Sequence, residues 1–241
     1  MPFTLAHPAV VLPLRDRGLP MPALVAGAMV PDAPQLLGLL GLRHESHSLL
    51  GVVTVDLGLG LIALVLWYAV YRRPLADIAP DPWRDRLPDQ VRMTARGWLL
   101  AVPGVLVGAL THVAWDSFTH EGTWVVDHVA PLRAEAGGVA VYDALQWLCS
   151  IAGLAIVYVA TRRYLRRLPR RPRRPAPLVG RWSLVVALAS AALLGMLVSA
   201  LVAPYGAEAA VYYLAVTPLL AVGVGITGIC VWWQLKRLIR R

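Results

Sequence analysis

Five apolar segments constrain this chain more than any other feature of its sequence, and each contains at most one charged residue. They cover residues 49–71, 97–115, 146–161, 182–203 and 211–233. An α-helix needs about 20 apolar residues to cross a bilayer, and inside lipid its backbone polar groups must pair with one another. Of the 241 residues, 58% are hydrophobic and 15% are charged, whereas about a quarter of the residues of soluble domains are charged. The sequence therefore predicts an all-α, polytopic helical membrane bundle with five spans, in one multi-pass domain over residues 1–241.

Residues 1–48 are apolar as well, but prolines interrupt them. In the helix-like run 23–42, Pro31 and Pro34 flank Asp32. Proline ends or kinks a helix, and non-helical backbone is tolerated at membrane depth where it is buried in protein or lines a cavity. We expect a broken or re-entrant helix with Asp32 at the break. Two interpretations of Asp32 stay open, since aspartate is a good helix N-cap and also a metal ligand.

The formal net charge of +9 comes mainly from arginines beside the apolar segments, in "YRRP", "TRRYLRRLPRRPRRP" and "LKRLIRR". Such placement is typical of the positive-inside rule and of attraction to anionic lipid headgroups. We therefore expect the 72–96 and 162–181 loops and the C-terminus to be cytoplasmic, in the plasma or inner membrane. The acidic 116–145 loop is expected on the outer side. Membrane lipids are the predicted partners, and nucleic acid is not, because no reading motif accompanies the basic residues.

A polar cluster lies where one apolar segment ends, in "THVAWDSFTHEG" at residues 111–122. His112, Asp116 and His120 are spaced by four, so on a helix they share one face, with a drift of about 80° and an axial spread of about 12 Å. A first-row ion binds imidazole nitrogen or carboxylate oxygen at about 2.0–2.2 Å. Adjacent members of the trio can therefore share an ion. Either His120 serves a neighbouring ion, or the helix turns after Asp116.

Further ligands have to come from other segments on the same predicted side. His44 and His47 in "RHESH" share a helix face, and Asp127 and His128 follow the polar cluster. Asp32 is a third source, and His7 joins only if the N-terminal segment folds inward. Glu121, with Glu45 as an alternative, is the candidate general base toward a metal-activated water. From the residues alone the ligand set stays open among these His and Asp side chains, with His112, Asp116 and His120 at its centre.

For several of these residues, a purely structural role remains open as an alternative to metal binding. Asp116 can cap a following helix, His128 can be solvated, and one polar contact to a neighbouring helix would explain Asp56. Clustering favours a metal site nonetheless, since five of the six histidines fall in two short stretches on one predicted side. Ionisable groups in spans are costly and usually face the protein interior or a water-filled cavity.

Several motifs, in order along nearly the whole chain, resemble the domain of unknown function 4184 family: "MPFTLAHPAVVLPL", "GAMVPDAPQLL", "HSLLG", "GALTHVAWDSFTHEG" and "LQWLCSIAGL". The chain is more distantly similar to bacterial inner-membrane proteins labelled metal-dependent hydrolases, whose pattern is in turn similar to zinc-dependent phospholipase C. This resemblance implies zinc, and it implicates six residues as metal ligands: His7, Asp32, His47, His112, Asp116 and His120. The chain has fewer His and Asp ligands than the phospholipase pattern, so one or two ions are expected rather than three.

Together, the residues and the resemblance predict a membrane-embedded metal-dependent enzyme. A hydrolase that acts on a lipid-like phosphoester, or on another amphiphilic small molecule near the outer face, is the leading interpretation. Two alternatives stay open. One is a non-hydrolytic enzyme, an isomerase or cyclase acting on a lipid-like product. The other is a non-catalytic transporter linked to metal ions or protons, or a membrane scaffold.

Overall fold

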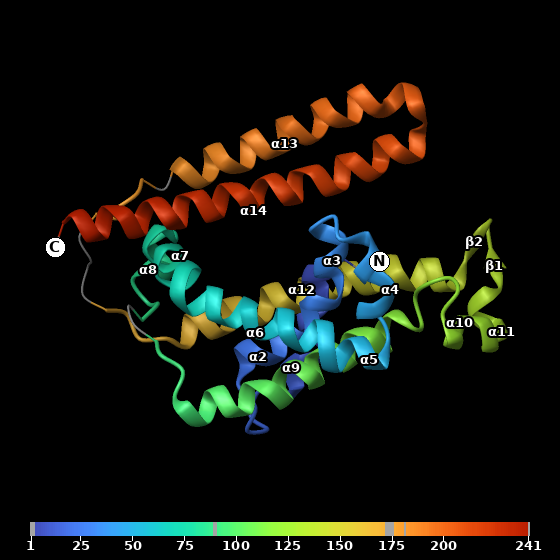
Figure 1. The fold of residues 1–241 in the computed structure, drawn as a ribbon, viewed down its shortest axis with the longest axis horizontal. Coiled ribbons are helices and arrows are strands. Elements are labelled where there is room, and N and C mark those ends of the chain that lie inside the picture. The colour runs from blue at the N-terminus through green and yellow to red at the C-terminus, as the bar shows by residue number, and fades with distance from the viewer. Residues whose placement is uncertain (1–2, 89–90, 172–175, 181, 241) are drawn as a thin grey trace. The chain divides into compact units, whose positions relative to one another are not determined.

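The structure, a computed structural model, describes residues 3–88, 91–171, 176–180 and 182–240, and nearly all of its regular structure is helical (Figure 1). Within these residues, five helices are long and apolar enough to cross a membrane: Leu49–Ile78, Ala95–Asp116, Val141–Arg167, Trp182–Tyr205 and Val216–Ile239. The predicted all-α class and its five spans are confirmed. The helices are compatible with a multi-pass membrane protein.

Most of the helices extend beyond the apolar segments that predicted them. The segment 146–161 lies within α12, Val141–Arg167, and the segment 211–233 lies within α14, Ala207–Ile239. A helix can continue into polar surroundings because its backbone bonds are internal, so the apolar run marks the membrane part and not the helix ends. The first spanning helix contains two π-helical turns, η5 at Val52–Asp56 and η6 at Trp67–Tyr71.

The chain forms two compact units. The first contains residues up to Val65 and Met93–Arg166. Its elements, apart from α12 and η5, are η1 Thr4–Ala6, α1 Pro8–Val11, η2 Leu12–Leu14, α2 Met21–Met29, η3 Val30–Asp32, α3 Ala33–Leu36, η4 Leu40–Leu42, α4 Arg43–Ser46, α5 Leu49–Gly51, α6 Leu57–Leu66, α9 Ala95–Asp116, α10 Trp124–His128, α11 Ala130–Arg133 and the antiparallel strands β1 Glu135–Ala136 and β2 Val139–Ala140.

The predicted break in the N-terminal helix is present. Helix α2 ends at Met29, a 3₁₀ turn follows at Val30–Asp32, and α3 then runs for one turn. Asp32 precedes α3 but its side chain makes no capping hydrogen bond. The N-cap interpretation of Asp32 is therefore wrong, and its carboxylate is available for other contacts.

Helices α2 and α9 pack together through small residues. A Cβ atom added to Gly27 would overlap the carbonyl oxygen of Val105, and one added to Gly108 would lie 2.7 Å from the Ala28 nitrogen. Gly104 is equally close to Ala23, at 2.8 Å from its Cβ. Small residues four positions apart let two membrane helices bring their backbones into contact. The two helices are thereby held at a separation that no larger side chain would permit.

The N-terminal segment packs on α12. The backbone nitrogen of Phe3 donates to the Ser150 hydroxyl at 3.0 Å, and a Cβ on Gly153 would lie 2.8 Å from the Cβ of Ala6. These contacts fold residues 3–7 into the first unit, which is the condition under which His7 was expected to reach the site.

The second unit comprises Leu66–Arg92 and Arg167–Arg241. Its elements are η6, α7 Arg72–Ile78, α8 Asp81–Arg84, α13 Trp182–Val202, η7 Ala203–Tyr205 and α14. Helices α13 and α14 form an antiparallel hairpin, drawn in orange and red in Figure 1. Asp77 ties the unit together, because its carboxylate accepts from Arg84 at 2.8 Å and from the Trp233 indole at 2.8 Å.

Replacing Gly108 with alanine tests the close approach of α2 and α9. We expect Gly108→Ala to destabilise the protein by about 1–3 kcal/mol, because the added methyl group meets backbone atoms that cannot move independently. Thermal unfolding in detergent measures the change. Gly58→Ala is the matched control, since this helical glycine faces open space. Equal unfolding temperatures for the two variants would contradict the packing described here.

Candidate metal centre

One face of helix α9 contains both the glycines that pack against α2 and two polar residues, His112 and Asp116. Gly104, Gly108, His112 and Asp116 follow one another at intervals of four, and all four are buried. Thr94 starts this helix by accepting a hydrogen bond from the Gly97 nitrogen at 3.1 Å. Because the glycines press this face against α2, the next two residues on the same face lie beside the turn that follows α2.

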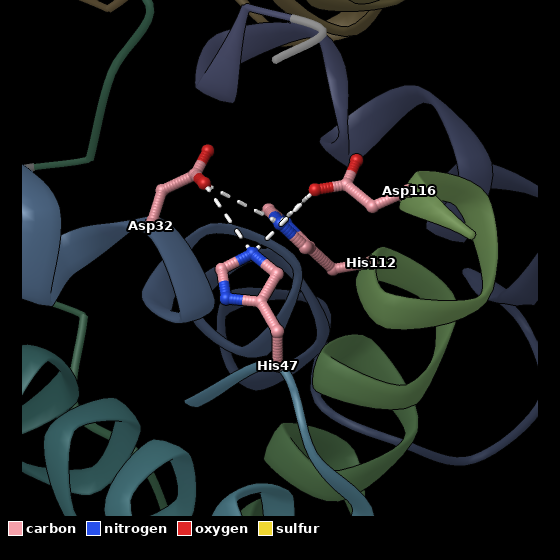
Figure 2. A group of neighbouring side chains, drawn as sticks. All are labelled: Asp32, His47, His112 and Asp116. Carbon is pink, nitrogen blue, oxygen red and sulfur yellow. Dashed lines mark ion pairs between the residues drawn. The ribbon is translucent and has the colours of Figure 1, made fainter. Parts of the chain in front are cut away.

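Four side chains from three segments converge at this place (Figure 2). Asp32 comes from η3, His47 from the residues after α4, and His112 and Asp116 from the end of α9. Their ligand atoms all lie within 4.8 Å of one another. The Nε2 atom of His112 is 3.2 Å from an oxygen of Asp116 and 3.6 Å from an oxygen of Asp32. The Nε2 atom of His47 is 3.5 Å and 3.9 Å from oxygens of the same two residues.

These distances fit a bound cation. Four ligands at about 2.0–2.2 Å from a tetrahedral ion are separated from one another by about 3.4 Å. The four measured nitrogen–oxygen distances, from 3.2 to 3.9 Å, lie around this value. Two carboxylates and two neutral imidazoles also balance the charge of one divalent ion. The donor set therefore suits a divalent metal that accepts nitrogen and oxygen ligands.

Hydrogen bonds orient both imidazole rings. The Nδ1 atom of His112 lies 2.9 Å from the carbonyl oxygen of Ala28, so it is the nitrogen that donates and Nε2 keeps its lone pair toward the site. The Nδ1 atom of His47 lies 3.1 Å from the Ser46 hydroxyl, which itself donates to the carbonyl oxygen of Pro31. Metal-binding histidines usually have such a partner on the second ring nitrogen.

The four side chains differ in their exposure to solvent. Asp32 and His112 are fully buried, whereas the side chain of His47 is 25% exposed. One oxygen of Asp32 accepts from the Thr4 hydroxyl at 2.6 Å. Its other oxygen and Nε2 of His112 are buried without a hydrogen-bond partner in the described residues. Such unsatisfied buried atoms are costly, so they are the atoms that a bound ion would satisfy.

His7 and His120 lie on the other side of Asp116. The Nε2 atom of His7 is 3.5 Å from the Asp116 oxygen that faces away from His112, and its ring stacks on that of His112 with centroids 3.8 Å apart. The Nδ1 atom of His120 is 3.8 Å from the same oxygen and 3.1 Å from the Asp116 carbonyl oxygen. Helix α9 ends at Asp116, as one of the two predicted arrangements requires, but His120 is not among the four residues whose ligand atoms converge.

The surroundings disfavour the charged form of these two imidazoles. Burial lowers the pKa of His7 from 6.5 to about 4, and the nearby His112 acts in the same direction. Burial also lowers the pKa of His120. Burial alone would raise the pKa of Asp32, but its contacts with His112 and the Thr4 hydroxyl outweigh this, and the pKa lies below its ordinary value.

The other described candidates are not among the four residues of the cluster. Glu121 is exposed on the turn after α9, and none of its described contacts reaches the cluster. Asp127 is exposed, and exposed His128 bonds through Nδ1 to the Trp124 carbonyl oxygen at 2.8 Å. The side chain of His44 lies outside the described residues. Reasoning from sequence missed Ser46, although a hydroxyl next to a candidate histidine was a usable signal.

Comparison with known proteins finds one family to which most of the chain is similar. A family model described as a domain of unknown function (DUF4184) matches residues 1–232. No curated protein and no solved structure matches the chain.

Removing the Ser46 hydroxyl should weaken metal binding without removing a ligand. We expect Ser46→Ala to lower metal affinity by about 10–100-fold, because His47 loses the bond that orients its ring. Competition with a fluorescent chelator measures the affinity. Ser117→Ala is the control, since this exposed hydroxyl bonds only to the nearby Ala114 carbonyl. Unchanged affinity in Ser46→Ala would argue against His47 as a ligand.

Acid should destabilise the metal-free protein through His7. Between pH 6.5 and about 4 the unfolded chain binds a proton at this residue and the folded chain does not, so stability falls as the pH falls. The loss is about 3 kcal/mol at the acid end of this range. Thermal unfolding of chelator-treated protein at several pH values should show a shallower decline for His7→Gln than for wild type. His128→Gln should follow wild type, and parallel curves for all three would contradict the assignment.

Proposed function

Because the chain belongs to the DUF4184 family, described only as having unknown function, its activity must be inferred from the site, and we propose that it is a membrane-embedded metal-dependent hydrolase. The proposed substrate is a lipid-like phosphoester or another amphiphile. One observation carries the proposal, namely the convergence of Asp32, His47, His112 and Asp116 within 4.8 Å. Zinc is the first candidate ion, since it is commonly held by four nitrogen and oxygen ligands.

A bound divalent ion would polarise a phosphoryl or carbonyl oxygen and lower the pKa of a water molecule. The residues of the chain supply the rest. Buried Asp32 and His112 form the closed side of the site, and partly exposed His47 lies on the side by which a headgroup enters. Among the described residues, all ligand atoms come close together only in this set of four, which favours one ion. His7 and His120 then orient Asp116 from its other oxygen.

An apolar groove beside the cluster supports an amphiphilic substrate. It has a volume of about 440 Å³, within the usual range of ligand pockets, and its exposed lining is almost entirely apolar. It lies between α1, α9 and α12 and is lined by Val10, Thr111, Ala114, Trp115, Phe118, Thr119, Leu145 and Cys149.

Residues that line the groove adjoin those of the site along the chain. Thr111 and Trp115 precede His112 and Asp116 directly, and the Thr119 hydroxyl lies 3.2 Å from Nδ1 of His120. The apolar lining of the groove favours a hydrocarbon chain as its occupant, with the polar headgroup of the substrate at the ion. In this proposal the site opens toward the outer face and the arginine-rich C-terminus is cytoplasmic, in keeping with the positive-inside rule.

The proposal predicts that metal and turnover are lost together. Purified wild type should carry about one ion and release the headgroup from a phospholipid or prenyl phosphate, whereas His112→Ala and Asp116→Ala should lose both properties. Elemental analysis and a phosphate-release assay over a panel of such substrates measure this. Ala114→Trp should fill the groove and raise KM while keeping the ion, and Ala189→Trp on the exposed face of α13 should change neither.

Two outcomes would contradict the proposal. If wild type purified without chelators binds no divalent ion even after zinc is added, the metal site does not exist. If the ion is present but no lipid-like substrate turns over, the transporter or scaffold interpretation is favoured instead.

A further inference from the structure

Asp56 is a buried carboxylic acid in the first unit that the contacts described so far leave unused. It lies in the membrane-spanning helix Leu49–Ile78, at the end of the π-helical turn η5. Val52, Asp56, Gly60 and Leu64 recur every four residues and are all buried, so Asp56 belongs to the inward-facing stripe of this helix. The residue itself is 0% exposed.

No polar partner explains this burial. Neither carboxylate oxygen of Asp56 has a hydrogen-bond partner in the described part of the chain. The structural alternative, one polar contact from Asp56 to a neighbouring helix, is therefore not found among these residues. An unpaired carboxylate in an apolar interior is costly, and ionisable residues inside membrane spans commonly serve function. A π-helical turn also recurs at functional sites.

The neighbours of Asp56 are the residues of the metal centre. The turn η5 packs against η3, α4 and α9. The charged or titratable groups that act on Asp56 from these directions are His47, His112 and Asp32. Because neither oxygen of Asp56 has a hydrogen-bond partner in the described residues, a proton can pass between Asp56 and the cluster only through a water molecule.

Charge balance limits what Asp56 can do there. The carboxylates of Asp32 and Asp116 already neutralise one divalent ion. A third carboxylate leaves a net negative charge in a buried place, and this charge is removed when Asp56 takes up a proton. Without the ion, the unpartnered acid is most stable in its neutral form, whereas a nearby cation favours the ionised form.

We propose that Asp56 is the proton-exchanging residue of this site, an inference that rests on the proposed metal-dependent hydrolysis. Ion binding expels the carboxyl proton of Asp56 to solvent. In turnover, a water molecule at the cluster gives one proton to the Asp56 carboxylate, and the water oxygen keeps the electron pair with which it attacks the ester. The proton then passes from Asp56 to the oxygen of the leaving group. This assigns to Asp56 the role of base for which Glu121 was the sequence candidate.

Infrared difference spectroscopy tests the proposal without a substrate. Adding Zn²⁺ to metal-free wild type in detergent should remove the carbonyl stretch of one protonated carboxyl group. Asp56→Asn should bind the ion with unchanged stoichiometry but lack this change, and Asp56→Glu should restore it at a shifted frequency. Thr54→Val, an exposed position in the same turn, should behave like wild type.

Any other result contradicts the role proposed for Asp56. Whether the metal site exists is decided separately, by ion binding to wild type. If Asp56→Asn binds the ion and the carboxyl band still disappears, another acid exchanges the proton. If Asp56→Asn loses the ion while Asp56→Glu retains it, Asp56 is a ligand. If wild type binds the ion with no carboxyl change, no proton exchange takes place, although the proposed metal site stands. Absence of ion binding in wild type contradicts the proposed function as a whole.

Discussion

The backbone contact between α2 and α9 is the constraint on which the metal centre depends. Gly27 and Gly108 allow the two helices to touch where any side chain would collide with a carbonyl group. The contact brings the Ala28 carbonyl oxygen within 2.9 Å of the His112 ring, and it places Asp32, at the end of the same segment, 3.6 Å from Nε2 of His112. In lipid, the hydrophobic effect does not drive helices to associate, so close packing has to hold them together. Small residues make this close packing of α2 and α9 possible.

Burying polar side chains in the first unit costs free energy, and bound species would offset this cost. Asp32, His112 and Asp56 are fully buried, and each has at least one polar atom without a hydrogen-bond partner in the described residues. Proteins seldom leave such atoms unsatisfied. A divalent ion would satisfy the first two residues, and a proton or a water molecule would satisfy the third. The second unit differs, since the Asp77 carboxylate there is fully used by Arg84, Leu178 and Trp233.

Much of the site was predictable wherever ligands share one local element. The spacing of His112 and Asp116 places them on one face of α9, and the prolines around Asp32 break the helix at that residue. The contacts of His47 and His7 with Asp116 could not be predicted in the same way. They depend on how the loop before α5 and the N-terminal segment fold back, which local spacing does not determine. Asp56 was visible in the sequence as a charge in a span, but its neighbours were not.

By itself, the sequence determined the helical class, the five apolar spans, the break at Asp32 and the polar face at the end of α9. These features follow from bilayer thickness, proline geometry and helical periodicity, all of which act within one segment. Only the tertiary structure decided that Asp32, His47, His112 and Asp116 meet, and that His7 and His120 lie near the far oxygen of Asp116. It also decided that Asp56 is buried without a hydrogen-bond partner in the described residues. These relations come from packing between segments far apart in the chain, where the shape of one surface sets the position of another.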